Sequence, residues 1–194
     1  MQTYGSQEIA CIYARGGVAL SGAEQTEVEG RLEDAILSVI THPPEGRFIA
    51  VTPAVILKNS GTLNFDYLIE NASKNPALSA KLGYLLDVAT ACVDAIQSPE
   101  RYHASIKRLP EAARLRPSPQ RIVFISNGAK IFFNDSDLLP RDEQQKRWNV
   151  GTRCELEEFK RHSRLAHLKG LSASLARLPA LGAGDPGSNE HKML

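Results

Sequence analysis

The chain contains no run of about 18 consecutive apolar residues, which excludes a membrane-spanning helix of ordinary length. It also opens without the charged and apolar segments of a signal peptide. Cysteine is scarce: Cys11, Cys92 and Cys154 are odd in number and widely spaced, which suits neither a disulfide framework nor a zinc site. These absences predict a cytoplasmic protein with reduced thiols.

Signatures of catalysis and cofactor binding are equally scarce. Gly16-Gly17 lacks the Lys-Ser/Thr pair of a phosphate-binding loop, so a turn is the better interpretation. His42 stands beside two prolines at an expected helix end, and His103 has no Cys or His at metal-ligand spacing. Ser126 and Ser163 lack the flanking glycines of a nucleophile elbow. We therefore expect a non-enzymatic protein without catalytic residues, bound metal or cofactor.

Length and composition predict one packed domain. The 194 residues are 42% hydrophobic and 23% charged, enough for a substantial core. We assign residues 1–178 to a single α+β domain: a helical body of four to six helices, with short β-hairpins near the N-terminus and around 121–133. The remaining tail, 179–194, is rich in Gly, Pro, Ser and Asn and is expected to be disordered.

Two adjacent helices have clear start signals. Asn64 can cap a helix whose residues Phe65, Leu68, Ile69 and Ala72 fall on one face. Asn75-Pro76 then restarts the chain as a cap followed by a first-turn proline, and apolar spacing continues to about residue 97. Gly83 lies inside this second helix, where we expect another backbone to pass close by.

Other helices are predicted on both sides of this pair. Thr26 and Glu29 have capping-box spacing and start a helix that His42-Pro43-Pro44 ends. Segment 47–58 is a helix or a buried strand, a choice that Pro53 leaves open. Further helices are predicted from Ser98-Pro99 to about residue 107 and over 154–178, where Leu156, Phe159, Leu165, Leu168 and Leu171 supply the apolar face.

Strands are predicted in two places. Segments 9–13 and 18–20 indicate an N-terminal hairpin joined through Gly16-Gly17, and segments 121–126 and 129–133 flank Asn127-Gly128, a strong hairpin signal. Segment 148–150 is expected to add a short strand. Trp148, the only tryptophan, is expected to pack in the core beside this hairpin. The alternative for Trp148 is an anchor at a partner interface.

Three phrases carry a family resemblance. The sequence has FDYLIENA from Phe65, then ALSAKLGYLLD up to Asp87, then LPRDEQQKRWNV from Leu139 to Val150. With Leu32, Asp34 and Leu37 before His42-Pro43, these phrases resemble, in order, the C-terminal domain of AbiEi-type antitoxins over about residues 25–152. Such antitoxins partner a nucleotidyltransferase-like toxin in abortive-infection systems.

The resemblance implies a bacterial antitoxin-like or regulatory protein acting through protein contacts or nucleic acid. Such antitoxins begin with a winged helix that binds operator DNA, which has no counterpart in residues 1–24, so we expect no DNA binding through that module. One alternative is a transcriptional cofactor whose DNA-binding module lies on a separate chain.

Charge is distributed unevenly along the chain. Residues 1–98 hold 6 Lys or Arg and 11 Asp or Glu, whereas residues 99–194 hold 17 and 11. A basic half can mark a nucleic-acid surface, although a solvated face of mixed charge is the simpler interpretation. The candidate nucleic-acid contacts are Lys146, Arg147, Lys160, Arg161, Arg164, His167 and Lys169.

Arg161 and His167 also allow an enzymatic alternative. An Arg and a His several residues apart on a helix resemble the pair in HEPN-type ribonucleases, which act on the RNA phosphate and 2′-hydroxyl. Basic amphipathic helices produce this spacing often by chance, so the non-enzymatic interpretation takes precedence.

Overall fold

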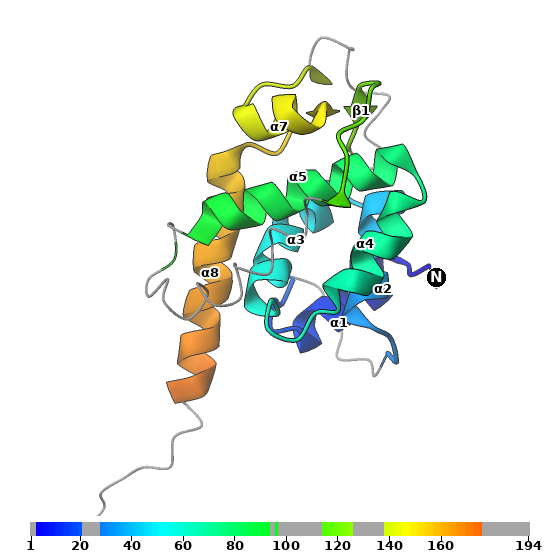
Figure 1. Cartoon of the computed structure of the whole chain (residues 1–194). Coiled ribbons are helices and arrows are strands. Elements are labelled where there is room, and N and C mark those ends of the chain that lie inside the picture. The colour runs from blue at the N-terminus through cyan, green and yellow to red at the C-terminus, as the bar shows by residue number, and fades with distance from the viewer. Residues whose placement is uncertain (1–2, 21–27, 94–95, 97–113, 126–137, 176–194) are drawn as a thin grey trace, which may run out of the picture.

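The protein is a helical body with one small sheet (Figure 1). The computed structural model describes residues 3–20, 28–93, 96, 114–125 and 138–175, and the side chains of this part up to residue 168. Within it lie seven helices: α1 (Ser6–Arg15), α2 (Leu32–Thr41), α3 (Gly46–Lys58), α4 (Phe65–Ser73), α5 (Pro76–Cys92), α7 (Glu143–Trp148) and α8 (Leu156–Leu175). Strands β1 (Ile122–Val123) and β2 (Val150–Gly151) form a two-stranded sheet. The helix-rich α+β class is confirmed at this level, with more helices than expected.

Helices α4 and α5 start directly after Asn64 and Asn75, the residues predicted to cap them. The side chain of Asn64 accepts a hydrogen bond from the Tyr67 amide, and that of Asn75 accepts one from the Ala77 amide. Each carboxamide thereby satisfies an amide of the first turn that has no partner within the helix. Pro76 occupies the first turn of α5, as predicted.

Helix α2 ends as predicted but starts later. It runs to Thr41, ahead of the His42-Pro43-Pro44 stop, but its first residue is Leu32 and its N-cap is Arg31. The prediction that Glu29 lies in the first turn, as part of a capping box, is therefore wrong, because Glu29 precedes the helix. Thr26 lies outside the described residues.

Segment 47–58 is a helix. Pro53 lies inside α3, and every residue of this helix from Phe48 to Leu57 is buried. Proline removes one backbone hydrogen bond from a helix, but the burial of nearly the whole of α3 outweighs that loss.

The predicted N-terminal hairpin is wrong. Residues 9–13 belong to α1, which is buried at five successive positions, and Val18 follows it in a loop. An apolar run of this length suits a buried helix as well as a strand. The carboxylate of Glu8 accepts a hydrogen bond from the Gly5 amide at 2.7 Å, a helix-start signal that the sequence analysis missed.

The first strand of the second predicted hairpin has a partner that was not predicted. β1 lies parallel to β2, with Ile122 opposite Val150 and Val123 opposite Gly151. The other predicted strand, 129–133, lies outside the described residues, as do the predicted helix of 98–107 and the tail 179–194. In segment 148–150, Trp148 ends α7, and Val150 begins the expected short strand.

The core is organised around α5. Figure 1 shows α5 crossing the body, with α3 and α4 below it and α7 above, while α8 crosses its C-terminal end. Tyr84 of α5 meets Phe159 of α8 edge to face, with ring centroids 6.1 Å apart. Tyr13 of α1 meets Phe48 of α3 in the same way at 6.3 Å. These contacts join both ends of the described chain to one core.

Candidate functional site

Trp148 lies in the core, where it connects α7 to α5. Its side chain is 3% exposed, and its indole covers Gly83 so closely that a Cβ there would lie 2.2 Å from the ring. The indole Nε1 donates a hydrogen bond to the carboxylate of Asp87 at 2.7 Å. Arg147 forms an ion pair with the same carboxylate at 3.1 Å.

This packing answers two expectations. Trp148 is a core residue, so its alternative role as an exposed interface anchor is not supported by its position. The close neighbour of Gly83 is an indole ring and not a backbone segment, which corrects the expectation for that glycine.

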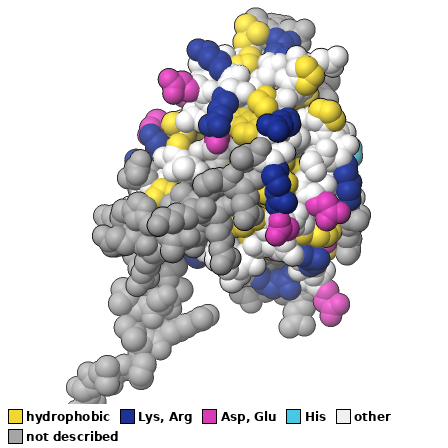
Figure 2. All heavy atoms as spheres, in the orientation of Figure 1, with side chains coloured by type: hydrophobic (Ala, Val, Ile, Leu, Met, Phe, Trp, Pro, Cys, Tyr) yellow, Lys and Arg dark blue, Asp and Glu magenta, His cyan; other side chains and the backbone are white. Residues whose placement is uncertain are grey.

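An open groove runs beside this junction, between α5 and α7. It has a volume of about 340 Å³ and is lined by Asp87, Thr90, Ala91, Glu143, Gln144 and Arg147. Asp87 is already engaged by the indole and the guanidinium, and the groove contains neither a histidine nor a cysteine. Figure 2 shows Lys and Arg side chains mixed with hydrophobic ones over the upper part of this face.

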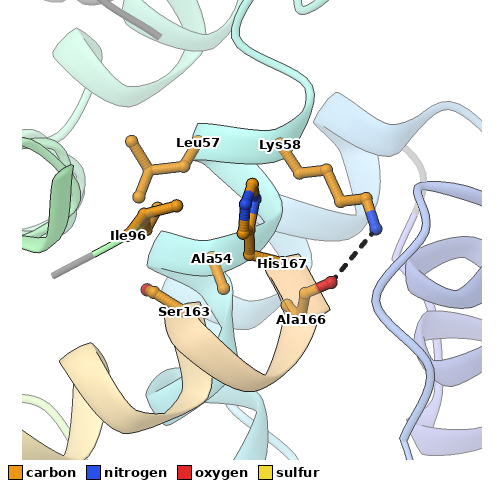
Figure 3. Close-up of a pocket in the computed structure, with 7 residues that line it drawn as sticks. All are labelled: Ala54, Leu57, Lys58, Ile96, Ser163, Ala166 and His167. Atoms are coloured by element: carbon orange, nitrogen blue, oxygen red, sulfur yellow. Dashed lines mark hydrogen bonds between the residues drawn. The ribbon is translucent and has the colours of Figure 1, made fainter. Parts of the chain in front are cut away.

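A smaller hollow lies between α3 and α8. Its lining residues are Ala54, Leu57, Lys58, Ile96, Ser163, Ala166 and His167 (Figure 3). It has room for about one water molecule. No small-molecule substrate fits in such a space.

The ammonium group of Lys58 links α3 to the loop after α1 and to α8. It donates hydrogen bonds to the carbonyl of Gly17 at 2.7 Å and to the carbonyl of Ala166 at 3.3 Å. Figure 3 shows the ammonium pointing away from the His167 ring and toward Ala166. Burial lowers the pKa of Lys58, because desolvation disfavours the charged form. The Gly16-Gly17 turn therefore receives a lysine donor and is not arranged around a phosphate.

Ser163 and His167 share the inner side of α8 but do not form a nucleophilic site. Ser163 is 2% exposed, and its hydroxyl lies against the thiol of Cys92. Burial raises the pKa of Cys92 to about 11, which keeps the thiol protonated and unreactive at neutral pH. Within the described residues, no group of three His, Cys, Asp or Glu side chains could hold a metal ion.

The predicted basic residues of α8 differ in exposure. Lys160 is partly buried and donates a hydrogen bond to Glu157 at 2.7 Å, and this bond lowers the pKa of Glu157. Arg161 and Arg164 are exposed, whereas His167 lines the hollow against α3. Lys160, Arg164 and His167 were expected on one side; only Arg164 of these three is exposed. The side chain of Lys169 lies outside the described part.

Lys146 and Arg147 lie on α7, away from this helix face. Both are exposed, and Arg147 is held by Asp87. Arg161 and His167 are six positions apart, which on a helix separates them by about 120° around the axis and about 9 Å along it. Arg161 is exposed whereas His167 lines the hollow against α3, so the two side chains do not meet at one open site in this chain, which does not favour the ribonuclease alternative.

Two leucines of α8 lie on a different face from the one predicted. Leu165 and Leu168 were expected on the buried face, but each is 48% exposed. The buried side is made by Phe159, Ser163 and Ala166, at i, i+4 and i+7. The signal was present in the sequence, because small residues at this spacing let a helix approach its neighbours closely.

Four exposed residues of α8 form what we call the outer stripe: Arg161, Arg164, Leu165 and Leu168. Their spacing of i, i+3, i+4 and i+7 places them on one face of the helix. The outer stripe combines positive charge with apolar surface on the side of α8 opposite to Phe159. Its arginines were predicted to be exposed, whereas its leucines were predicted to be buried.

Comparison with known proteins gives no further assignment: no protein-family model, curated protein or solved structure matches this chain. None of the helices in the described part is long and apolar enough to cross a membrane.

Proposed function

We propose that this chain is a non-enzymatic, antitoxin-like regulatory protein of a toxin–antitoxin or phage-defence system. It acts in the cytoplasm by binding a partner protein, for which a nucleotidyltransferase-like toxin is the first candidate. The proposal rests on the resemblance of residues 25–152 to AbiEi-type antitoxins.

One observation carries the proposal furthest. The phrases behind the resemblance are distant in sequence, yet Trp148 of the last phrase packs on Gly83 and bonds Asp87 of the middle one. Asp34, in the segment that precedes these phrases in the resemblance, accepts a hydrogen bond at 2.7 Å from Tyr67 of the first phrase. Residues that specify each other's contacts in this way are expected to recur together in a family with one fold.

The character of the described surfaces supports a binding role over catalysis. The hollow beside His167 has room for only about one water molecule, and the residues that line the groove beside Asp87 include no nucleophile with an adjacent base. An exposed basic and apolar face, in contrast, is typical of protein recognition surfaces, in which arginine is enriched.

Co-expression with the candidate toxin tests this function. We expect the chain to restore growth of bacteria that express a nucleotidyltransferase-like toxin encoded next to it, and to purify with that toxin as a complex. A toxin that the chain does not normally accompany serves as the control. Undiminished toxicity in the presence of abundant, folded chain would overturn the proposal.

A further inference from the structure

The groove between α5 and α7 has two polar walls. Asp87 and Thr90 belong to the α5 wall, and Glu143, Gln144 and Arg147 belong to the α7 wall. Its volume of about 340 Å³ is at the lower end of the range for ligand sites. A whole helix, about 10–12 Å wide with its side chains, does not enter such a space, whereas a single side chain does.

The groove carries one negative charge that no neighbour compensates. Glu143 and Arg147 are one turn apart on α7, a spacing at which the two side chains can pair. Arg147 instead reaches across the groove to Asp87, at 3.1 Å, and neutralises that carboxylate. Glu143 is exposed, and its carboxylate forms no ion pair within the described part of the chain. Two carboxylates and one guanidinium therefore line the groove, which is complementary to a single added cation.

Both walls also supply hydrogen-bond acceptors. The indole of Trp148 and the guanidinium of Arg147 both engage Oδ2 of Asp87, which leaves Oδ1 as an acceptor. The hydroxyl of Thr90 donates to the carbonyl of Leu86 at 2.9 Å, so its oxygen can only accept further bonds. On the α7 wall, the carboxylate of residue 143 is an acceptor only. A positively charged group with several donors can use the acceptors of both walls at once.

Arginine fits this arrangement better than other cations. Its guanidinium presents five N–H donors in one plane, whereas lysine ends in a compact ammonium with three. A planar fork of donors can bond the carboxylates of Asp87 and Glu143 from one position between them. A metal ion is less suitable, because no group of three His, Cys, Asp or Glu side chains in the described residues could hold one. A phosphate would be repelled by the carboxylate of Glu143.

We propose that the groove between α5 and α7 binds one arginine side chain of the partner protein. The guanidinium of that arginine pairs with Glu143 and donates hydrogen bonds to Oδ1 of Asp87 and to the hydroxyl oxygen of Thr90. This inference rests on the proposed function, because it names a contact through which a protein partner is held.

Trp148 supplies the signal for the test. It is the only tryptophan of the chain, so its indole N–H gives a single NMR peak, and this N–H is bonded to Asp87 of the groove. The isotope-labelled full chain is titrated with the blocked tripeptide acetyl-Gly-Arg-Gly-amide. The same peptide with citrulline in place of arginine is the control, since citrulline keeps the length and planarity of the side chain but has no charge.

We expect the arginine peptide to shift the indole peak in a saturable manner. Its affinity should exceed that of the citrulline peptide at least about tenfold, because hydrogen bonds between charged groups are stronger than those to a neutral group. Equal affinity for the two peptides, or an indole peak that neither peptide moves, would overturn the proposal.

Variants locate the binding site. Glu143→Gln removes the charge that has no ion pair and should weaken binding of the arginine peptide about tenfold. Thr90→Val removes an acceptor of the α5 wall with little change in shape and should weaken binding severalfold. Glu70→Gln is the matched control, because Glu70 is 75% exposed on α4, and it should leave binding unchanged. Equal losses in Glu143→Gln and Glu70→Gln, with both proteins shown by circular dichroism to be folded, would overturn the proposal.

Two further measurements separate the remaining outcomes. Displacement of the arginine peptide by magnesium chloride, but not by sodium chloride at the same ionic strength, would reassign the groove to a divalent cation and overturn the proposal. If the wild-type chain neutralises the toxin and Glu143→Gln neutralises it equally well, the inference fails and the proposed function stands. If the arginine peptide binds in the groove and the toxin is not neutralised, the proposed function fails and the arginine site remains.

Discussion

Gly83 shows how a single residue without a side chain determines the packing of two helices. Trp148 needs a flat surface on α5, and only glycine leaves room for its indole. In return the indole fills the space completely and fixes its Nε1 on Asp87. The glycine costs α5 about 1 kcal/mol of helix propensity relative to alanine. The burial of a tryptophan ring, which removes a large apolar area from water, exceeds that cost.

Gly83→Ala should therefore destabilise the protein, although alanine is the better helix former. Its Cβ would lie 2.2 Å from the indole carbons, so the ring or α5 must shift, at a cost of about 1–3 kcal/mol in the free energy of unfolding. Gly46→Ala, at the start of α3 with no atom within 4 Å of the added Cβ, is the matched control and should be neutral or slightly stabilising. Urea denaturation of both variants measures the difference; a more stable Gly83→Ala protein would contradict the packing.

Cys92 predicts how stability depends on alkaline pH. Burial raises the pKa of its thiol in the folded state from 9.0 to about 11, so above pH 9 the unfolded chain loses this proton first. A raised folded pKa gives stability that is present in full below pH 9 and is lost as pH rises toward 11. Cys92→Ala should remove part of this loss, so its free energy of unfolding should fall less steeply between pH 9 and 11. Identical slopes for Cys92→Ala and the wild type would show that the thiol is not buried.

At the scale of elements, a helix can be predicted more reliably than the face it buries. The spacing over 154–178 correctly predicted α8, and the leucines were assigned to the core because leucine is the commonest core residue. In the structure the small residues Ser163 and Ala166 face α3, since the crossing of two helices there leaves little space between their backbones. Larger side chains at these positions would hold the helices apart. Which face of a helix is buried depends on the helix that packs against it, and the sequence of α8 alone does not identify that helix.

The same substitution in α5 and α8 tests this assignment of faces. Leu82→Ala removes a side chain that is fully buried and should cost about 2–5 kcal/mol in the free energy of unfolding. Leu165→Ala makes the identical chemical change at a position that is 48% exposed and should cost no more than about 0.5 kcal/mol. Thermal or chemical denaturation of the two proteins is sufficient. Comparable losses would mean that Leu165 is part of the core, and the outer stripe would then have no basis.

Across the whole molecule, helix starts that neighbouring residues specify could be predicted, whereas contacts between segments far apart in the sequence could not. Asn64 and Asn75 cap their helices with their own side chains, so a few neighbouring residues specify each start. β1 pairs with β2, whose residues lie far along the chain, and no local pattern at Ile122 names that partner. The small hollow lined by Lys58 and His167 brings together residues of α3 and α8 for the same non-local reason. The exposure of the arginines in the candidate site could be predicted from their charge. The exposure of the leucines beside them could not, because it depends on how the whole chain packs.

The uneven charge of the molecule predicts weak nucleic-acid binding at most. The basic excess lies after residue 98, yet Lys160 and Arg147 are engaged by Glu157 and Asp87. Arg161 and Arg164 are exposed on α8 and are the expected phosphate contacts, each of which adds about 0.9 to the salt dependence of binding. We expect duplex DNA to bind only at low salt and without regard to its sequence.

Replacing Arg161 and Arg164 together by alanine should lower the slope of log K against log salt by about 2, and weaken binding equally for all duplexes. Anisotropy titrations of two unrelated duplexes at about 50 mM and about 200 mM salt measure both quantities. Arg31→Ala is the control. This arginine lies over the ring of Tyr67 and belongs to the acidic first half of the sequence. Tight binding that discriminates between the duplexes at the higher salt would contradict the prediction. It would require a reading surface for bases, and the leucines of the outer stripe cannot provide the hydrogen bonds by which bases are distinguished.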